Sequence, residues 1–175
     1  MKGLRQIITV IFLLNSSILS GQDISIKYND LINRVEQIEK DNSFEKVTLE
    51  NEELMSQMSD GGGELTGYFK RGKVQKITMK LGFSYGVSTS HYYFSEGKLI
   101  FIKKVLEKFP YIESEANFDY SNLVTSFVGN YYFRNEKLID SDFRGQNDFE
   151  KQSNHTETIL LNEVEDYKDK LEGRI

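Results

Sequence analysis

The sequence predicts an α+β fold: an N-terminal helix, an antiparallel β-meander of about seven to eight strands, and a C-terminal helix packed on the sheet. Three observations predict it. Apolar residues repeat at helical spacing near both ends of the chain, they alternate with polar residues in the middle, and one aromatic hairpin motif recurs three times there. An aromatic content of 13% and a hydrophobic content of 38% supply enough large side chains for a packed core.

The first 21 residues have the pattern of a signal peptide. Lys2 and Arg5 precede the apolar run 7–14, and small residues end the segment just before Gln22. An uncleaved anchor is the alternative, although the run is short for a membrane span. Removing this segment lowers the formal net charge from −5 to about −7. We therefore expect residues 22–175 to form a single domain without a membrane span, periplasmic or secreted.

The mature chain is predicted to begin with a helix over residues 23–41. One apolar stripe runs along it, formed by Ile24, Tyr28, Leu31, Ile32, Val35 and Ile38. A coiled-coil dimer would use the same stripe. Because the segment holds fewer than three heptads, packing on the protein's own sheet is the favoured interpretation.

The strand region contains a weak internal repeat. Residues 68–74 (Tyr-Phe-Lys-Arg-Gly-Lys-Val) recur as 93–99 and again as 132–138. Each copy is an aromatic strand end, a short connection, and then a Lys followed by an apolar strand start. Three hairpins in series predict an antiparallel meander. The continuous apolar run 99–102 further predicts a strand that is covered on both faces.

The connections of this repeat predict particular turns. A three-residue connection suits a type I turn closed by a left-handed residue, and Gly72 and Gly97 fit that position. Glu136 takes the same place in the third copy, a mismatch of about 1 kcal/mol. A two-residue turn at Asn135-Glu136 is the alternative for that hairpin.

An aromatic insertion, residues 107–126, separates the second and third copies of the repeat. It contains Pro110, the only proline of the chain, where a strand should stop. Such an insertion is either a lid over a cavity or a packed surface loop, and the loop is the favoured interpretation.

The second helix is predicted over residues 154–172. Asn154, with Glu157 three residues later, suggests a capping box. The apolar stripe that would face the sheet consists of Leu160, Leu161, Val164, Tyr167 and Leu171.

Composition excludes several classes of function. An acidic balance without a basic stripe argues against nucleic acid as a partner. The absence of Cys excludes disulfides, thiolate metal sites and a Cys nucleophile. Two separated histidines, His91 and His155, cannot form a zinc site unaided. We therefore predict neither a metal site nor a cofactor.

Three short motifs resemble sites without having their context. Residues 82–86 match the G-x-S-x-G nucleophile elbow, but a strand pattern follows, so we expect Ser84 in a hairpin loop. Residues 140–145 resemble the start of an EF-hand loop, in which Arg144 replaces a ligand. The glycine run 61–63 precedes a strand instead of the helix that phosphate binding needs. No catalytic residue is predicted.

The aromatic triplets 92–94 and 131–133 supply the candidate binding residues. Adjacent rings point to opposite faces of a strand, so an open face would present tyrosines to a sugar, peptide or partner strand. If helices cover that face, the rings are core, which is the favoured interpretation. The candidate binding residues are His91, Tyr92, Tyr131 and Tyr132.

The Tyr-Tyr-Phe-x-x-Gly-Lys-Leu hairpin at 92–99, the Gly-Gly-Gly-Glu-Leu-Thr-Gly-Tyr-Phe stretch at 61–69 and the signal ending before Gln22 resemble uncharacterised exported proteins of Bacteroidota. The resemblance covers residues 44–143. It implies a location in a Gram-negative envelope and carries no known activity or catalytic residues. A more distant likeness to MORN-type hairpin repeats is weakened by Glu136 and by the long insertion.

The preferred hypothesis is a non-catalytic exported module that binds a protein, peptide or glycan. One alternative is a small envelope hydrolase that uses carboxylates or Ser84, with the segment 107–126 as a lid. The other is a half-barrel carrier, which would hold an apolar ligand between sheet and helices. A cleft joining Ser84 or paired acids to a His would favour the hydrolase, whereas an apolar cavity of ligand size would favour the carrier.

Overall fold

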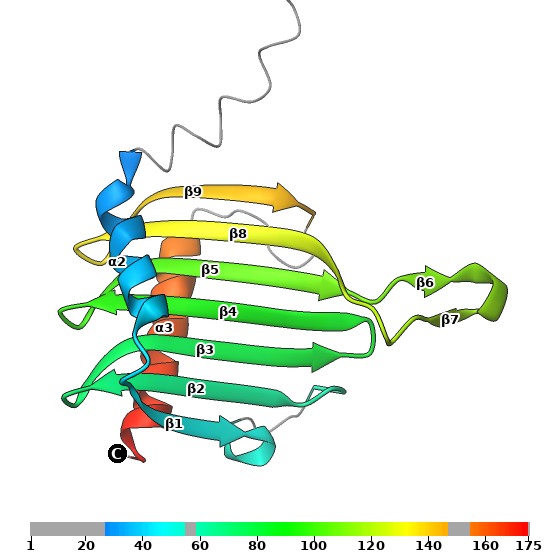
Figure 1. Ribbon diagram of the computed structural model, residues 1–175, viewed down its shortest axis with the longest axis horizontal. Coiled ribbons are helices and arrows are strands. Elements are labelled where there is room, and N and C mark those ends of the chain that lie inside the picture. Colours follow the sequence, from blue (N-terminus) through cyan, green and yellow to red (C-terminus); the bar gives the residue numbers. More distant parts are fainter. Residues whose placement is uncertain (1–26, 55–58, 147–154, 175) are drawn as a thin grey trace, which may run out of the picture.

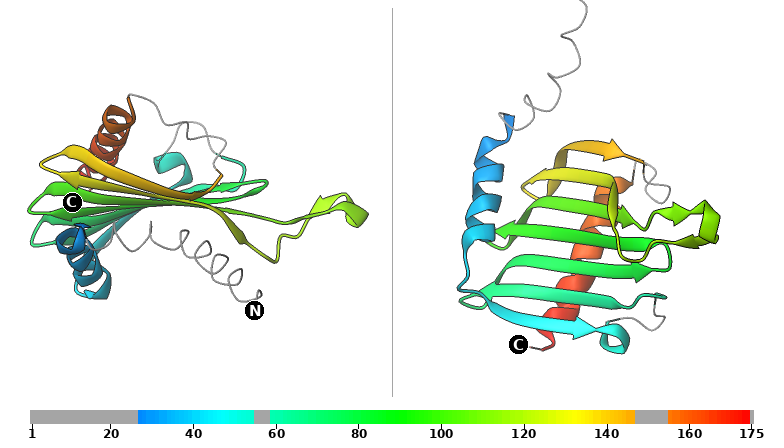
Figure 2. Two further views of the ribbon diagram at one scale, coloured as in Figure 1. Left: turned by 90° about the horizontal axis from the view of Figure 1, so that it is seen from above. Right: turned by 45° about the vertical axis from the view of Figure 1, so that its right-hand side comes forward.

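The structure is a computed structural model, and it describes residues 27–54, 59–146 and 155–174. Seven antiparallel strands form one open sheet with a helix on each face (Figures 1 and 2). The α+β class and the order helix, sheet, helix are therefore confirmed. Among the described residues, no helix combines the length and the apolar character that a membrane crossing needs.

The strands of the sheet lie side by side in chain order, with one interruption between β5 and β8. They are β1 (Glu45–Glu50), β2 (Gly63–Lys70), β3 (Lys73–Phe83), β4 (Gly86–Ser95), β5 (Lys98–Lys108), β8 (Val124–Arg134) and β9 (Lys137–Gly145). The interruption is a small separate hairpin made of β6 (Tyr111–Ile112) and β7 (Asn117–Phe118), which a short 3₁₀ turn (Glu113–Glu115) connects. The outer strands are β1 and β9.

The three copies of the repeat form the hairpins β2–β3, β4–β5 and β8–β9. Their turns are Arg71-Gly72, Glu96-Gly97 and Asn135-Glu136, and all six residues have positive φ. The three-residue connection predicted for the first two copies is therefore wrong, whereas the two-residue alternative for the third is correct. The register shifts at each Tyr-Phe pair instead, so the extra residue lies in a strand bulge next to the turn.

Helix α3 (Thr156–Glu172) covers one face of the sheet. The phenylalanines of the three repeats, Phe69, Phe94 and Phe133, belong to the core on this side. The helix adds Leu160, Val164 and Leu171 to the same core. Large side chains from every repeat thus meet under a single helix.

Helix α2 (Asn29–Lys40) covers the opposite face. It buries Leu31 and Ile38 against the repeat tyrosines Tyr93 and Tyr132 and against Phe101. Because the helices lie on opposite faces, both members of the second and third aromatic pairs are buried, whereas Tyr68 of the first pair is half-buried. Strand β5 is covered on both sides, as predicted.

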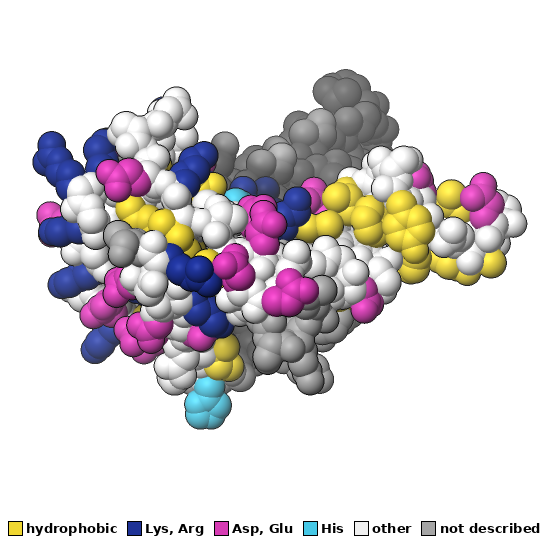
Figure 3. Space-filling model, turned by 90° about the horizontal axis from the view of Figure 1, so that it is seen from below, with side chains coloured by type: hydrophobic (Ala, Val, Ile, Leu, Met, Phe, Trp, Pro, Cys, Tyr) yellow, Lys and Arg dark blue, Asp and Glu magenta, His cyan; other side chains and the backbone are white. Residues whose placement is uncertain are grey.

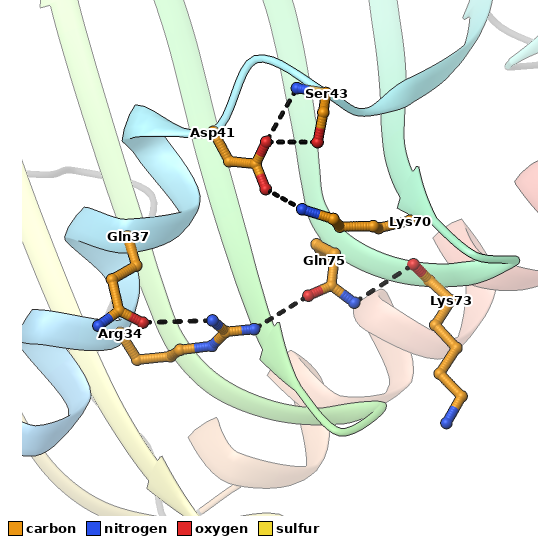
Figure 4. Close-up of polar contacts among 7 residues, drawn as sticks. All are labelled: Arg34, Gln37, Asp41, Ser43, Lys70, Lys73 and Gln75. Atoms are coloured by element: carbon orange, nitrogen blue, oxygen red, sulfur yellow. Dashed lines mark hydrogen bonds and ion pairs between the residues drawn. The ribbon is translucent and has the colours of Figure 1, made fainter.

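Polar contacts from the middle of α2 and from Asp41 at its C-terminal end attach the helix to the first hairpin (Figure 4). Arg34 donates to Gln75 at 3.1 Å, and Gln75 is the extra residue of the β2–β3 bulge. The carboxylate of Asp41 accepts hydrogen bonds from Ser43 and Lys70. These bonds hold the pKa of Asp41 well below its usual range. The bulge therefore also serves as an attachment point for the helix.

The predicted starts of both helices fall partly outside the described residues. Residues 23–26 and Asn154 lie outside the described residues, so the structure does not show the capping box. Glu157 instead accepts a hydrogen bond from the backbone N–H of Leu138 at 2.8 Å. This bond attaches the first turn of α3 to the outer strand β9.

The glycine run has a structural role. The N–H of Gly61 donates to the carbonyl of Gly82, and the N–H of Gly82 donates to the carbonyl of Gly62, each at 3.0 Å. A Cβ on Gly61 or Gly82 would lie within 3 Å of the other's backbone, so two bare backbones must meet here.

Candidate functional site

The candidate tyrosines do not form an exposed platform. Tyr92, Tyr131 and Tyr132 are 0%, 2% and 4% exposed. Tyr92 packs edge-on against Tyr167 of α3 with ring centroids 5.6 Å apart, whereas Tyr132 stacks on Tyr28 at 4.8 Å on the other face. This burial agrees with the interpretation of the triplets as core.

His91 lies on β4, half-buried and apart from Tyr92. Its Nδ1 is 3.2 Å from the hydroxyl of Thr78. Burial, and then the nearby charge of Lys76, lower the pKa of His91 to about 4. The imidazole is therefore neutral near pH 7.

A polar cluster beside His91 connects α2 to the sheet. One carboxylate oxygen of Glu39 accepts from the Tyr93 hydroxyl and from Lys76 Nζ, both at 2.6 Å. Burial opposes ionisation of Glu39, yet these two hydrogen bonds outweigh it and lower the pKa of Glu39. Burial and Glu39 together raise the pKa of Tyr93. Each polar group has a partner, so the cluster stabilises the fold.

The motifs that resemble catalytic or metal-binding sites do not come together in space. Ser84 is exposed in the β3–β4 turn, a hairpin and not a strand-to-helix elbow, whereas His91 lies within β4. Asp140 and Asp142 of the EF-hand-like segment lie on β9 and accept hydrogen bonds from Tyr28 and Tyr132. Within the described ranges, no three His, Cys, Asp or Glu side chains come together as a metal site would require.

The most distinctive surface is the hairpin between β5 and β8, residues 109–123, which we call the arm. It extends beyond the end of the sheet and does not fold over either face as a lid would (Figures 1 and 2). At its base, Phe109 N–H donates to the carbonyl of Tyr85 at 3.0 Å, and Asp119 N–H donates to the carbonyl of Pro110 at 2.8 Å. The first bond attaches the base of the arm to the β3–β4 turn, and the second closes the hairpin of the arm itself.

Four aromatic rings pack against one another along the arm. Their centroids lie 5.1 Å apart for Phe109–Tyr120, 6.2 Å for Phe118–Tyr120 and 5.3 Å for Tyr111–Phe118, and all three contacts are edge-on. Tyr111 is 56% and Tyr120 is 57% exposed. Figure 3 shows these hydrophobic side chains on the surface of the arm.

The arm is also acidic. Residues 109–123 contain Glu113, Glu115 and Asp119 but no Lys, Arg or His. The Asp119 carboxylate accepts from the backbone N–H and the hydroxyl of Ser121, which orders the turn that carries Tyr120. The arm therefore presents preordered rings beside negative charge.

The sequence contained a signal for this arm. Aromatic residues alternate at 109 and 111 and again at 118 and 120, on either side of a polar turn. That spacing is typical of a short hairpin. The insertion was predicted as a lid or a packed loop because the sequence does not show in which direction a hairpin projects.

No protein-family model, curated protein or solved structure matches this chain. Function must therefore be inferred from the surfaces themselves.

Proposed function

We propose that this protein is an exported, non-catalytic binding module whose arm docks into an apolar cleft of a partner protein rimmed by Lys and Arg. The observation that carries the proposal is the row of four packed rings on the arm, of which Tyr111 and Tyr120 are exposed and Phe109 and Phe118 are half-buried. Contiguous exposed apolar surface on a soluble domain typically marks an interaction site.

The geometry of the arm favours a protein partner over a glycan. Adjacent rings are inclined by 60–75° to each other, so they offer no common flat face for stacking on a sugar. Rings at such angles fill separate pockets, which is how aromatic anchors bind in protein interfaces. Because the rings already pack on one another, docking orders few side chains and loses little entropy.

The charge of the arm determines the rim of the cleft. Three carboxylates and no base on residues 109–123 would be repelled by an anionic membrane surface and attracted by Lys and Arg. We include export in the proposal because of the N-terminal signal pattern and the Bacteroidota-like hairpins, so the proposed partner is an envelope or extracellular protein.

Photocrosslinking from the arm tests this proposal. A photoreactive phenylalanine analogue at position 120 is compared with the same analogue at position 159, because Tyr120 and Ile159 are equally exposed at 57%. The mature chain is used, and its mass shows whether it begins near Gln22. We expect a specific cross-linked envelope protein from position 120 and none from position 159.

Affinity for the purified cross-linked protein completes the test. Tyr120→Ser should weaken binding by about 30-fold, a value typical of an interface hot spot, whereas Ile159→Ser should leave it unchanged. Glu113→Gln with Glu115→Gln should slow association and reduce its salt dependence. Equal cross-linking from both positions, or full binding by Tyr120→Ser, would show that the arm is not the docking surface.

A further inference from the structure

A second site, independent of the arm, lies between α3 and the sheet. It is a pocket of about 200 Å³ on the part of the α3 face that points towards the arm. Two rows of side chains that cross the sheet form its floor. One row is Leu81, Ser88, Leu106 and Phe127, and the other is Met79, Ser90 and Lys104.

The pocket exists because β4 changes from large to small side chains. Tyr92 fills the space beneath α3 in the next row of the sheet. Ser88 and Ser90 point to the same face as Tyr92, but their side chains are short. The space between α3 and the sheet is therefore not filled there. Apolar side chains surround the two serines, so the pocket has an apolar lining with the serine hydroxyls at its centre.

An ion pair forms the wall on the helix side. Lys104 Nζ lies 3.1 Å from Glu163 Oε2, and the two side chains are only 15% and 25% exposed. The Tyr167 hydroxyl donates to the other carboxylate oxygen of Glu163 at 3.2 Å. Since the opposite charges cancel, a charged ligand would lose its hydration here without a net countercharge to compensate, whereas a neutral polar group would not.

Hydrogen-bonding capacity at this wall is incomplete. Within the described residues, Glu163 Oε2 has the ionic contact with Lys104 but no hydrogen bond of normal geometry. The hydroxyl of Tyr92 is buried beside Ser90 and Glu163, which are close enough to shift its pKa, but it makes no hydrogen bond of normal geometry with a described residue. Burial raises the pKa of Tyr92 well above its usual value, so this hydroxyl retains its proton. Buried groups of this kind are normally satisfied, and a bound hydroxyl would donate to the carboxylate.

We propose that this pocket binds a small neutral phenol, with its ring among Leu81, Leu106 and Phe127 and its hydroxyl donating to Glu163. Size supports this class of ligand, because a dry apolar cavity of about 150 Å³ accommodates benzene and this pocket measures about 200 Å³. The position of Glu163 and Lys104 supplies the polar end, and the serines leave room for the ring.

Binding to the mature chain is measured by calorimetry and by NMR with three probes of similar size. These are p-cresol, toluene, which lacks the hydroxyl, and hexanoate, which is anionic. We expect p-cresol to bind with a Kd of about 1 mM or tighter. Toluene and hexanoate should bind at least about tenfold more weakly. Shifted signals should come from Ser88, Ser90 and Leu106, and not from Tyr111 of the arm.

Matched variants test the residues. Glu163→Gln should weaken p-cresol binding about tenfold without affecting toluene, whereas Glu165→Gln, on the exposed side of α3, should change neither. Ser88→Leu fills the hollow and should abolish binding of both probes, while Thr89→Leu points to the opposite face and should not. Circular dichroism shows that each variant is folded.

Three results would overturn the proposal. They are the absence of p-cresol binding to the folded wild-type chain, equal or tighter binding of toluene or hexanoate, and unchanged p-cresol binding by folded Ser88→Leu. Failure of the arm to dock on a partner would leave this site untouched, because the two surfaces share no residue.

Discussion

At the scale of single residues, the third repeat shows that a residue which departs from a sequence pattern can still adopt the backbone conformation of that pattern. The sequence identified Glu136 as the residue that departs from the Gly of the other two copies. The structure places it at φ 61°, in the left-handed region that Gly72 and Gly97 also occupy. The third turn therefore differs from the other two in residue type but has the same backbone conformation. Strand pairing on either side of the turn imposes that conformation.

Glu136→Gly should stabilise the protein. A residue with a Cβ is strained by about 1 kcal/mol in the left-handed region, and Asn followed by Gly is the preferred pair for this turn. We expect the free energy of unfolding in urea to rise by about 1 kcal/mol. Glu136→Ala is the control, since it removes the charge and keeps the strain. An equal gain in both variants would assign the effect to charge.

His91 should make stability depend on pH. Its pKa is lowered to about 4 in the folded protein, from 6.5. Between these values the unfolded chain binds a proton that the folded chain does not, so stability falls as the pH is lowered through this interval. Lys76 on β3 and Lys103 on β5 oppose protonation of His91, whereas Glu39 on α2 favours it.

The measurement is urea unfolding of wild type and His91→Gln at two pH values. Between about pH 7 and pH 5, the wild type should lose about 1–2 kcal/mol more stability than the variant. His155→Gln, at the exposed start of α3, should behave like the wild type. If His91→Gln kept the full pH dependence, the loss would have to come from carboxylates.

At the scale of elements, hairpins were predictable because their signals are local. A Tyr-Phe strand end, a turn and a Lys-apolar start lie within seven residues of each other. The bulges were not predictable, because they depend on which residue of one strand faces which residue of the next. The bulge residue Gln75 shows this, since its contact partner Arg34 lies on a distant helix.

The arm should be dispensable for folding. Lys108 and Val124 are paired where β5 and β8 leave the sheet. A two-residue Asn-Gly turn in place of residues 109–123 should therefore close the two strands into an ordinary hairpin. We expect a cooperative thermal transition within roughly 5 °C of the wild type, together with loss of partner docking.

The control is a variant with the same two-residue connection between β5 and β8 but with residues that cannot form the tight turn. Pro-Pro in place of Asn-Gly cannot adopt the positive φ that this turn requires, and it should lower the midpoint of the transition. Loss of cooperative folding in the Asn-Gly variant would show that the arm belongs to the core.

At the scale of the whole molecule, the sequence predicted the order of elements but not the faces that the helices cover. Each helix is joined to an outer strand, and both faces of the sheet carry large apolar side chains. Periodicity alone therefore cannot assign a helix to a face. The interpretation of the tyrosines depended on this assignment, because they are core only if both faces are covered.

The candidate sites, too, were only partly predictable from the sequence. The acidic and aromatic composition of the arm was evident from the sequence, whereas its exposure was not. A ligand cavity between sheet and helices was one of the alternatives from the sequence, but the residues that line the pocket were not predicted, although two signals existed. Lys104 and Glu163 are charged residues at positions where the strand and helix patterns call for inward-facing side chains. Their pairing emerges only when α3 is placed on the sheet.

The two ends of the molecule differ in charge. Lys70, Arg71, Lys73, Lys98 and Lys137 lie at or beside the hairpin turns opposite the arm, where they outnumber the turn acids Glu96 and Glu136. Figure 3 shows Lys and Arg side chains together with acidic ones at that end. The aromatic, acidic surface is at the other end. The partner proposed for the arm would therefore meet the end of the molecule away from these bases.

The outer strands β1 and β9 have a consequence for solubility at high concentration. An open sheet with bare edges would recruit further copies and grow into cross-β fibrils. Here Glu45, Lys46 and Glu50 on β1 and Asp140, Asp142 and Arg144 on β9 place charges along both edges. Pairing of one sheet edge with another would have to desolvate these charges, so they disfavour sideways growth of the sheet.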